Sequence, residues 1–186
     1  MTLFEYLAIA FSLVFSFSAM RLLSGLPYAI RPEARYWVHL TFVLIHLLGT
    51  ALSFWNFWAF RLADWTLPRF LLALASPAVV YFIACSLVPE NPSAVTSWRN
   101  HYYSARRSFF LGLSVWALVL AGATTLVIGL PWFHPARAGQ AVLLLIGALG
   151  IFFTSPRVHA ALAVGVVVAI AVIASTVYLQ PASLTG

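Results

Sequence analysis

Residues 37–60 of the chain read WVHLTFVLIHLLGTALSFWNFWAF, a run without a single Asp, Glu, Lys or Arg. A helix rises 1.5 Å per residue, so this run is about 36 Å long, more than the roughly 30 Å hydrocarbon core of a bilayer. The absence of charge over that length predicts a transmembrane helix.

Five further apolar runs of similar character flank this one. They cover about residues 3–25, 67–88, 108–130, 138–154 and 158–179. The whole chain is 63% hydrophobic and 8% charged, with a mean hydropathy of +0.98, whereas soluble domains are about a quarter charged. We therefore expect one all-α domain, an integral membrane bundle of about six transmembrane helices, with a polar cytoplasmic loop at 89–107.

The basic residues predict how the bundle is oriented. The net charge of +6 comes from ten arginines and no lysine, and these are dispersed between apolar runs, which argues against nucleic-acid binding. Seven lie around the first, third and fifth loops: Arg21, Arg31, Arg35, Arg99, Arg106, Arg107 and Arg157. Three lie around the other loops: Arg61, Arg69 and Arg137. By the positive-inside rule the first group is cytoplasmic and both termini are periplasmic.

Two pairs of short segments suggest an internal repeat. Gly-Leu-Pro followed by an aromatic residue occurs at 25–28 and again at 129–132, and Arg69 and Arg157 precede similar Ala/Val-rich patterns. Because each half would hold three spans, a true duplication would be inverted, as in many transporters. Chance similarity between Ala/Val/Leu-rich helices is the alternative.

The run at 37–60 carries polar side chains along one helical face. His39 and His46 lie two turns apart, and Thr50, Ser53 and Asn56 extend the face. Ionisable groups inside a membrane commonly face the bundle interior or a water-filled path. This stripe is either a proton or ion path or a set of interhelical hydrogen bonds that fixes the packing.

Metal and haem binding are not expected on this stripe. The two histidines are about 10 Å apart along the helix, too far to share one metal ion. A haem would need a second axial ligand from another helix, and the remaining histidines all lie near predicted membrane ends. We therefore predict no metal and no cofactor.

The polar segment at 89–107 offers a candidate anion or lipid-headgroup contact. Its candidate residues are Arg99, His101, Arg106 and Arg107. Arginines interleaved with aromatic residues are typical of a segment that lies in the headgroup layer. The alternative is a gate or docking site that clamps an anionic ligand.

The last two runs are rich in small residues at helix-contact spacing. These are Gly147 and Gly150 in the fifth run, and Ala161, Gly165 and Ala169 in the sixth. Small residues let helix backbones approach closely in membranes. They predict a tight hairpin of the last two helices or an interface between subunits.

No catalytic signature is present in the chain. It has no Walker A loop, HExxH or GxSxG motif. Its four carboxylates, Glu5, Glu33, Asp64 and Glu90, form no close pair within a span. The single cysteine, Cys85, lies in an apolar run, where it is a small hydrophobe. We leave enzymatic activity open and lean against it.

Several motifs together resemble a group of small bacterial polytopic inner-membrane proteins without known activity. They are LFEY at 3–6, RLLSGL at 21–26, YWVHL at 36–40, SWR at 97–99 and RRSFF at 106–110. The resemblance covers the first four spans. It implies a bacterial inner (plasma) membrane location and nothing about activity.

Two functional hypotheses follow. The first is a small transporter or channel-type protein with a polar path along the second helix. The second is a non-catalytic accessory or structural subunit of a larger membrane complex. Both imply membrane lipids as partners, together with a second copy of the chain or another membrane protein.

Overall fold

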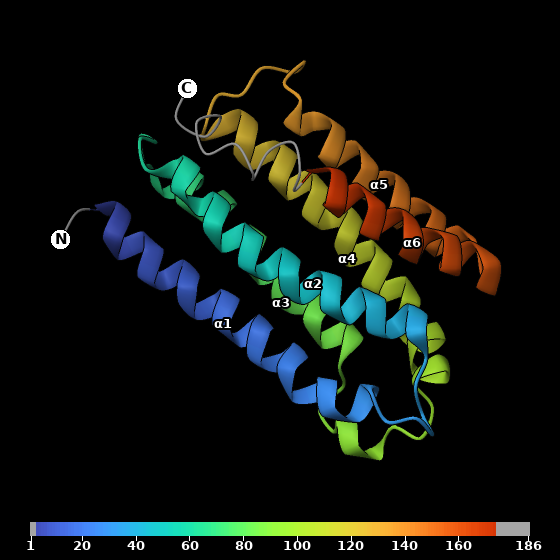
Figure 1. Cartoon of the computed structure of the whole chain (residues 1–186). Coiled ribbons are helices and arrows are strands. Elements are labelled where there is room, and N and C mark those ends of the chain that lie inside the picture. The colour runs from blue at the N-terminus through green and yellow to red at the C-terminus, as the bar shows by residue number, and fades with distance from the viewer. Residues whose placement is uncertain (1–2, 174–186) are drawn as a thin grey trace.

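The computed structural model of the chain describes residues 3–173, apart from the Ala136 side chain, as an all-helical bundle (Figure 1). The α-helices are α1 Leu3–Ala29, α2 Trp37–Asn56, α3 Leu67–Leu87, α4 Trp98–Leu126, α5 Ala136–Phe152 and α6 Pro156–Ile173. Two 3₁₀ helices, η1 Phe57–Phe60 and η2 Pro92–Ala94, lie in the connections after α2 and α3.

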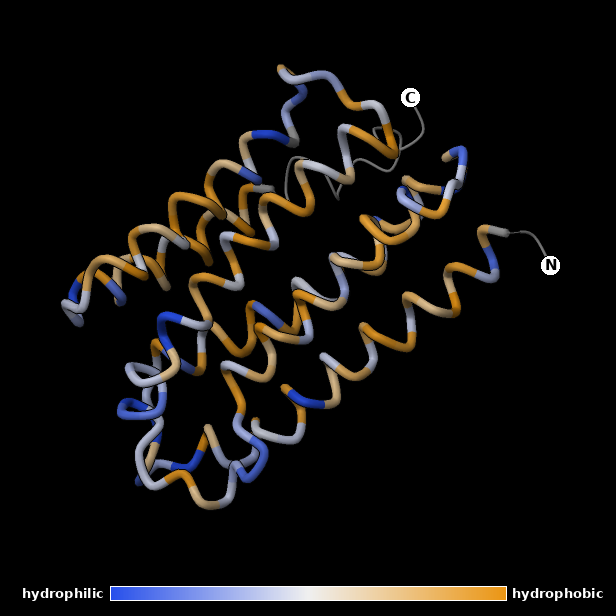
Figure 2. Tube along the Cα trace, turned by 180° about the vertical axis from the view of Figure 1, so that it is seen from behind, coloured by the Kyte–Doolittle hydropathy of each residue, from blue (hydrophilic) through white to orange (hydrophobic). Residues whose placement is uncertain are grey.

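Four helical segments are long and apolar enough to cross a membrane. They are Phe4–Ala29, Trp37–Phe60, Leu67–Ala94 and Trp98–Leu126, and hydrophobic residues follow their length in Figure 2 while hydrophilic ones gather at their ends. The chain is therefore a membrane protein by composition and helix length. α5 has 17 residues, about 26 Å of helix, and α6 is described over 18 residues, up to Ile173; both are apolar but shorter than these four segments. The six-span prediction is supported for four helices, and residues 174–179 of the predicted sixth span lie outside the described residues.

The polar loop predicted at 89–107 is largely helical, which corrects that boundary. α4 begins at Trp98, ten residues before the predicted fourth span. The Ser97 hydroxyl accepts a hydrogen bond from the Asn100 backbone N–H at 3.4 Å and caps the helix. The first span also continues past Gly25 to Ala29. α4 therefore begins with a polar part, residues 98–107, that the sequence analysis assigned to a loop, and α1 extends beyond its predicted end through residues 26–29.

α3 lies at the centre of the four longer helices. It packs against α1, α2 and α4, and Val80, Ile83 and Ala84 on it are fully buried. α5 packs along α4, and α6 packs chiefly against α2. The first three helices contact one another, whereas α6 makes few contacts with α5. The two halves of the chain thus pack differently, and the packing lends no support to an inverted repeat.

Glycines mark the closest helix approaches. A Cβ at Gly25 would come within 2.5 Å of the Val88 side chain, and one at Gly112 within 2.7 Å of Ile83. A Cβ at Gly147 would overlap the Ser114 hydroxyl, and one at Gly150 would overlap the Phe110 ring. These glycines let α1 approach the end of α3, and let α4 approach both α3 and α5.

Of the two predicted roles for the small residues, a tight α5–α6 hairpin or a subunit interface, the hairpin does not form through the glycines of α5. Gly147 and Gly150 face α4. Ala161 and Gly165 on α6 are exposed, and Ala169 is half-buried. The spacing of small residues identified a close contact on α5, but it carried no information about which helix is the neighbour.

Replacing Gly150 by Leu should weaken the bundle, because the new side chain has no room beside Phe110. We expect the free energy of unfolding to fall by about 1–3 kcal/mol, the usual effect of overpacking. Unfolding of the detergent-solubilised protein in increasing SDS measures it. Gly165→Leu is the matched control, because nothing lies within 4 Å of a Cβ there. Equal losses in the two variants would contradict the α4–α5 contact.

Candidate functional site

The carboxyl end of α3 is closed by side chains from three other helices. The Leu87 carbonyl oxygen accepts from His39 Nε2 of α2 at 2.9 Å and from His101 Nε2 of α4 at 3.1 Å. The next carbonyl, of Val88, accepts from Arg21 Nε of α1 at 2.9 Å. The last carbonyls of a helix have no partner within it, and cationic or N–H donors suit the negative end of its dipole. We call these three side chains, His39, His101 and Arg21, the α3 cap.

Aromatic contacts hold the α3 cap in place. The His39 ring stacks on Trp98, with centroids 4.7 Å apart and planes 22° apart. The Trp98 indole N–H in turn donates to the Tyr28 carbonyl at 3.0 Å, near the end of α1. Trp98 is fully buried. One indole thus closes the end of α1 and orients the histidine that closes α3.

The histidine tautomer follows from the partners. A carbonyl oxygen can only accept, so Nε2 of His39 and of His101 must each carry the hydrogen. The other nitrogen of His39, Nδ1, is buried without a hydrogen-bond partner. His39 is 1% exposed. The His39 ring is therefore neutral: it donates one hydrogen bond through Nε2 and accepts none at Nδ1.

The carboxyl end of α5 is closed in the same way. His159 Nε2 donates to the Phe153 carbonyl at 3.0 Å, and Arg106 Nη1 donates to the Ile151 carbonyl at 3.0 Å. With its Nε2 protonated, neutral His159 accepts at Nδ1 from the Tyr102 hydroxyl at 2.8 Å. Tyr102 and His159 are both buried. These contacts tie α4, α5 and α6 together, and we call them the α5 cap.

Tyr36, just before α2, extends this polar layer. Its hydroxyl lies 3.3 Å from that of Tyr103. Burial, followed by the hydrogen bond with Tyr103, raises the pKa of Tyr36 well above its ordinary value. The phenol therefore stays protonated and remains available as a hydrogen-bond donor.

The predicted polar stripe on α2 is buried at its histidine end and exposed at Asn56. His46 Nε2 donates to the Val80 carbonyl of α3 at 2.9 Å. Thr50 donates to the His46 carbonyl and Ser53 to the Gly49 carbonyl, at 2.8 and 2.7 Å. The two histidines thus bind α3, while the two hydroxyls bind their own helix.

The predicted headgroup residues fall into two groups. His101 and Arg106 belong to the α3 and α5 caps, with His101 and Arg106 both half-buried. Arg99 and Arg107 are exposed. Only the latter two of the four project from the bundle and remain suitable for a headgroup contact.

Arg137, at the opposite end of the bundle, makes the densest polar contact. Its Nη1 donates to Thr124 Oγ1 at 2.7 Å and Gln140 Oε1 at 3.0 Å. Its Nη2 donates to Thr125 Oγ1 at 2.8 Å and the Leu130 carbonyl at 2.9 Å. All of these acceptors are neutral. The guanidinium therefore joins α5 to the end of α4 as a planar fork.

Sequence reasoning missed five residues of these contacts as functional positions: Arg21, Trp98, Tyr102, Arg137 and His159. Each lies near a predicted membrane end, where an interfacial role is the ordinary interpretation. No signal in the sequence separates such a residue from an ordinary interfacial one, because the neighbouring helix end is known only from the structure. Within residues 3–173, no group of three or more His, Cys, Asp or Glu side chains is placed to hold a metal ion.

The shared acceptor in the α3 cap predicts coupling between His39 and His101. Phe at either position removes a donor but keeps an aromatic ring, and one donor remains on the Leu87 carbonyl. Each single variant should lose about 1 kcal/mol of unfolding free energy. The double variant leaves that carbonyl without a side-chain donor, so its loss should exceed the sum by about 1 kcal/mol. SDS unfolding of all four proteins measures the coupling, and strict additivity would rule out a shared acceptor.

Arg137 should not be replaceable by Lys. An ammonium is a point charge and cannot reach Thr124, Thr125 and the Leu130 carbonyl at once. We expect Arg137→Lys to lower the free energy of unfolding by about 2 kcal/mol, as for a lost buried charged hydrogen-bond network. Arg69→Lys is the control, since half-buried Arg69 donates to a single backbone carbonyl, that of Asp64, through an exposed hydrogen bond. Similar small losses in both variants would show that the fork geometry is unimportant.

Comparison with known proteins gives no independent assignment of this arrangement. No protein-family model, no curated protein and no solved structure matches the chain. The function must therefore be argued from the described side chains and their contacts.

Proposed function

We propose that the protein is a non-catalytic accessory or structural subunit of a larger membrane complex. The observation that supports this most is the role of the buried polar side chains. His39, His46 and His159 donate to backbone carbonyls of α3 or of the α5 end. Such bonds fix helices relative to one another, as a rigid scaffold requires.

The distribution of carboxylates supports a non-catalytic role. Glu5, Glu33, Asp64 and Glu90 are all exposed. General acid–base chemistry in the bilayer would need a titratable pair within reach of a bound substrate. The buried histidines are engaged in hydrogen bonds to backbone carbonyls, and no carboxylate lies beside them inside the bundle.

The surface supports a membrane-protein partner or a second copy of the chain. α6 exposes Ala161, Val164, Gly165 and Val168 on one side, a surface on which another helix packs closely.

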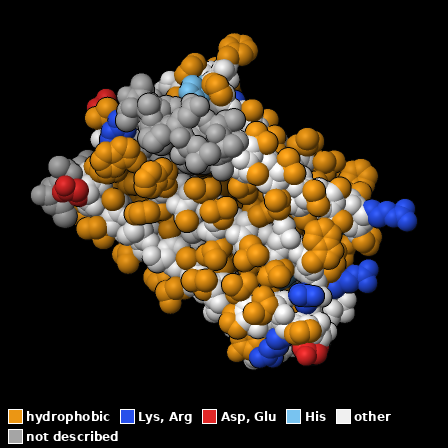
Figure 3. Space-filling view, viewed as in Figure 1, with side chains coloured by type: hydrophobic (Ala, Val, Ile, Leu, Met, Phe, Trp, Pro, Cys, Tyr) orange, Lys and Arg blue, Asp and Glu red, His pale blue; other side chains and the backbone are white. Residues whose placement is uncertain are grey.

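The distribution of arginines supports one orientation of the bundle in a bacterial inner membrane. In Figure 3, most of the visible basic side chains lie at the end of the bundle that holds the α1–α2 and α3–α4 connections. The exposed arginines of that end are Arg31, Arg35, Arg99, Arg107 and Arg157. We propose that this end is cytoplasmic, which makes the amino terminus periplasmic.

Transport along α2 is the second candidate. It is favoured by the continuous burial of His39, His46 and Thr50 and by the unpartnered His39 Nδ1. Against it, each of these side chains already donates to a carbonyl. A path would require the His46–Val80 and His39–Leu87 hydrogen bonds to open.

Native mass spectrometry after mild extraction from the native membrane separates the candidates. An accessory subunit of a larger complex travels with another polypeptide. A Gly165→Trp variant, which places a large ring on the exposed face of α6, should lower that association at least tenfold. Val142→Trp, on the exposed side of α5, is the comparison. A chain that remains monomeric, and whose proton or ion flux in liposomes disappears in His46→Ala, would overturn the proposal in favour of transport.

A further inference from the structure

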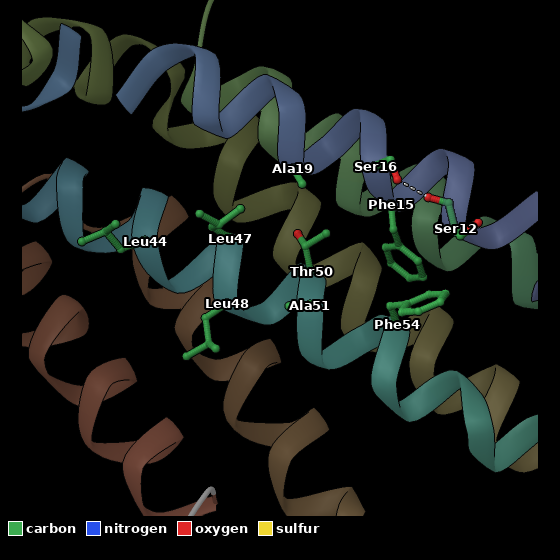
Figure 4. A pocket seen from close by; sticks show the side chains of 10 residues that line it. All are labelled: Ser12, Phe15, Ser16, Ala19, Leu44, Leu47, Leu48, Thr50, Ala51 and Phe54. Atoms are coloured by element: carbon green, nitrogen blue, oxygen red, sulfur yellow. Dashed lines mark hydrogen bonds between the residues drawn. The ribbon is translucent and has the colours of Figure 1, made fainter. Parts of the chain in front are cut away.

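Two surface features of the bundle differ in what they offer a ligand. Figure 4 shows the first, a groove between α1 and α2 whose walls include Ser12, Ser16 and Thr50. These three hydroxyls donate to the carbonyls of Ile9, Ser12 and His46 in their own helices, and the other lining side chains are apolar. The groove therefore has no free hydrogen-bond donor. The first three turns of α4, in contrast, carry donors and positive charge that the fold leaves unused.

One face of this part of α4 is formed by Arg99, Tyr103 and Arg107. They are spaced four residues apart, so each is a neighbour of the next on the helix surface. Arg99 and Arg107 are exposed, and neither has a hydrogen-bond or ion-pair partner within residues 3–173. Arg106, three residues after Tyr103, is half-buried and donates only to neutral carbonyls at the end of α5. Three guanidinium charges thus lie within about one helical turn of Tyr103 without a carboxylate partner.

Tyr103 and Tyr36 together keep a free hydroxyl hydrogen beside these charges. Their oxygens are 3.3 Å apart, so one hydroxyl donates to the other, and the second hydrogen has no acceptor within the described residues. Both side chains are only half-buried. Burial, followed by this hydrogen bond, raises the pKa of Tyr36, whereas the charge of Arg99 acts to lower it. Arg99 is therefore close enough to the hydroxyl pair to share a ligand with it.

This face fits an anion that has several acceptor oxygens and more than one negative charge. Guanidinium groups bind phosphate oxygens through paired N–H donors. A phosphate monoester has three such oxygens and a charge of about −1.5 to −2 at neutral pH. A phosphodiester has fewer free oxygens and a single charge. The monoester therefore engages more of the donors and offsets more of the three arginine charges.

We propose that Arg99, Arg107 and the Tyr36–Tyr103 hydroxyl pair, which we call the phosphate face, bind a phosphate monoester group. The two guanidiniums and the free O–H donate to its oxygens, and Arg106 adds positive charge. Because the phosphate face lies at the end of a membrane-length helix, both a lipid headgroup and a soluble ester can reach it. This site goes beyond the proposed structural role and does not depend on it.

Lipid retention tests the preference for a monoester. The protein is reconstituted in phosphatidylcholine vesicles that hold equal amounts of phosphatidic acid, a monoester, and phosphatidylglycerol, a diester, with identical acyl chains. It is then extracted gently, and the retained lipids are quantified. We expect phosphatidic acid to exceed phosphatidylglycerol about fivefold, the effect of about one additional hydrogen bond. Arg107→Gln should remove most of this preference. Arg31→Gln is the matched control, because it removes another exposed arginine from the same end of the bundle.

The hydroxyl pair allows a second test that changes no charge. Tyr103→Phe alone leaves the Tyr36 hydroxyl free to donate, so this variant should keep most of the preference. Tyr36→Phe combined with Tyr103→Phe removes both hydroxyls, and the preference should fall by about twofold.

Soluble glycerol phosphate distinguishes the two sources of the phosphate group. Added at millimolar concentration during extraction, it displaces phosphatidic acid if the phosphate face takes soluble esters, and it leaves the lipid in place if the lipid is the ligand. Three results would overturn the proposal. They are equal retention of the two anionic lipids, the same loss of preference in Arg31→Gln as in Arg107→Gln, and a preference that the double tyrosine variant leaves unchanged.

Discussion

The last carbonyl oxygens of a helix lack intrahelical partners, and near a bilayer few water molecules are available to replace them. In this protein side chains from neighbouring helices supply the missing donors. The Leu87 carbonyl receives two imidazole N–H groups and the Val88 carbonyl receives a guanidinium N–H. Each donor comes from a different helix, so closing the end of α3 also determines where α1, α2 and α4 stand around it.

The same solution recurs at the end of α5 and determines how the shorter helices attach. Arg106 reaches the carbonyls of that end from α4, and His159 reaches the Phe153 carbonyl from α6. α6 packs chiefly against α2, and the Tyr102–His159 hydrogen bond joins its first turn to α4. Close packing at Gly147 and Gly150 brings α4 near enough for Arg106 to reach its acceptors.

The sequence was sufficient for the helical class, for four membrane-length spans and for the inward orientation of His39 and His46. Hydropathy and the seven-residue spacing act within one helix and need no knowledge of its neighbours. The partners of those histidines could not be predicted, because His39 meets Leu87 only once α3 is known to end beside it. For the same reason Arg106 and Arg107, adjacent in the sequence, looked equivalent, although one closes α5 and the other is exposed. The small residues of α5 identified a close contact without identifying α4 as its partner.

The central claim is that the buried histidines bind backbone carbonyls of neighbouring helices, His39 at the end of α3 and His46 within it, and do not line an aqueous path. Solid-state ¹⁵N NMR of histidine-labelled protein in lipid bilayers tests it most directly, with each signal assigned through a single-histidine variant. The account predicts neutral rings with the hydrogen on Nε2 for His39 and His46, and slow exchange of that hydrogen with water. Rapid exchange with water along both histidines, or the hydrogen on Nδ1, would contradict it.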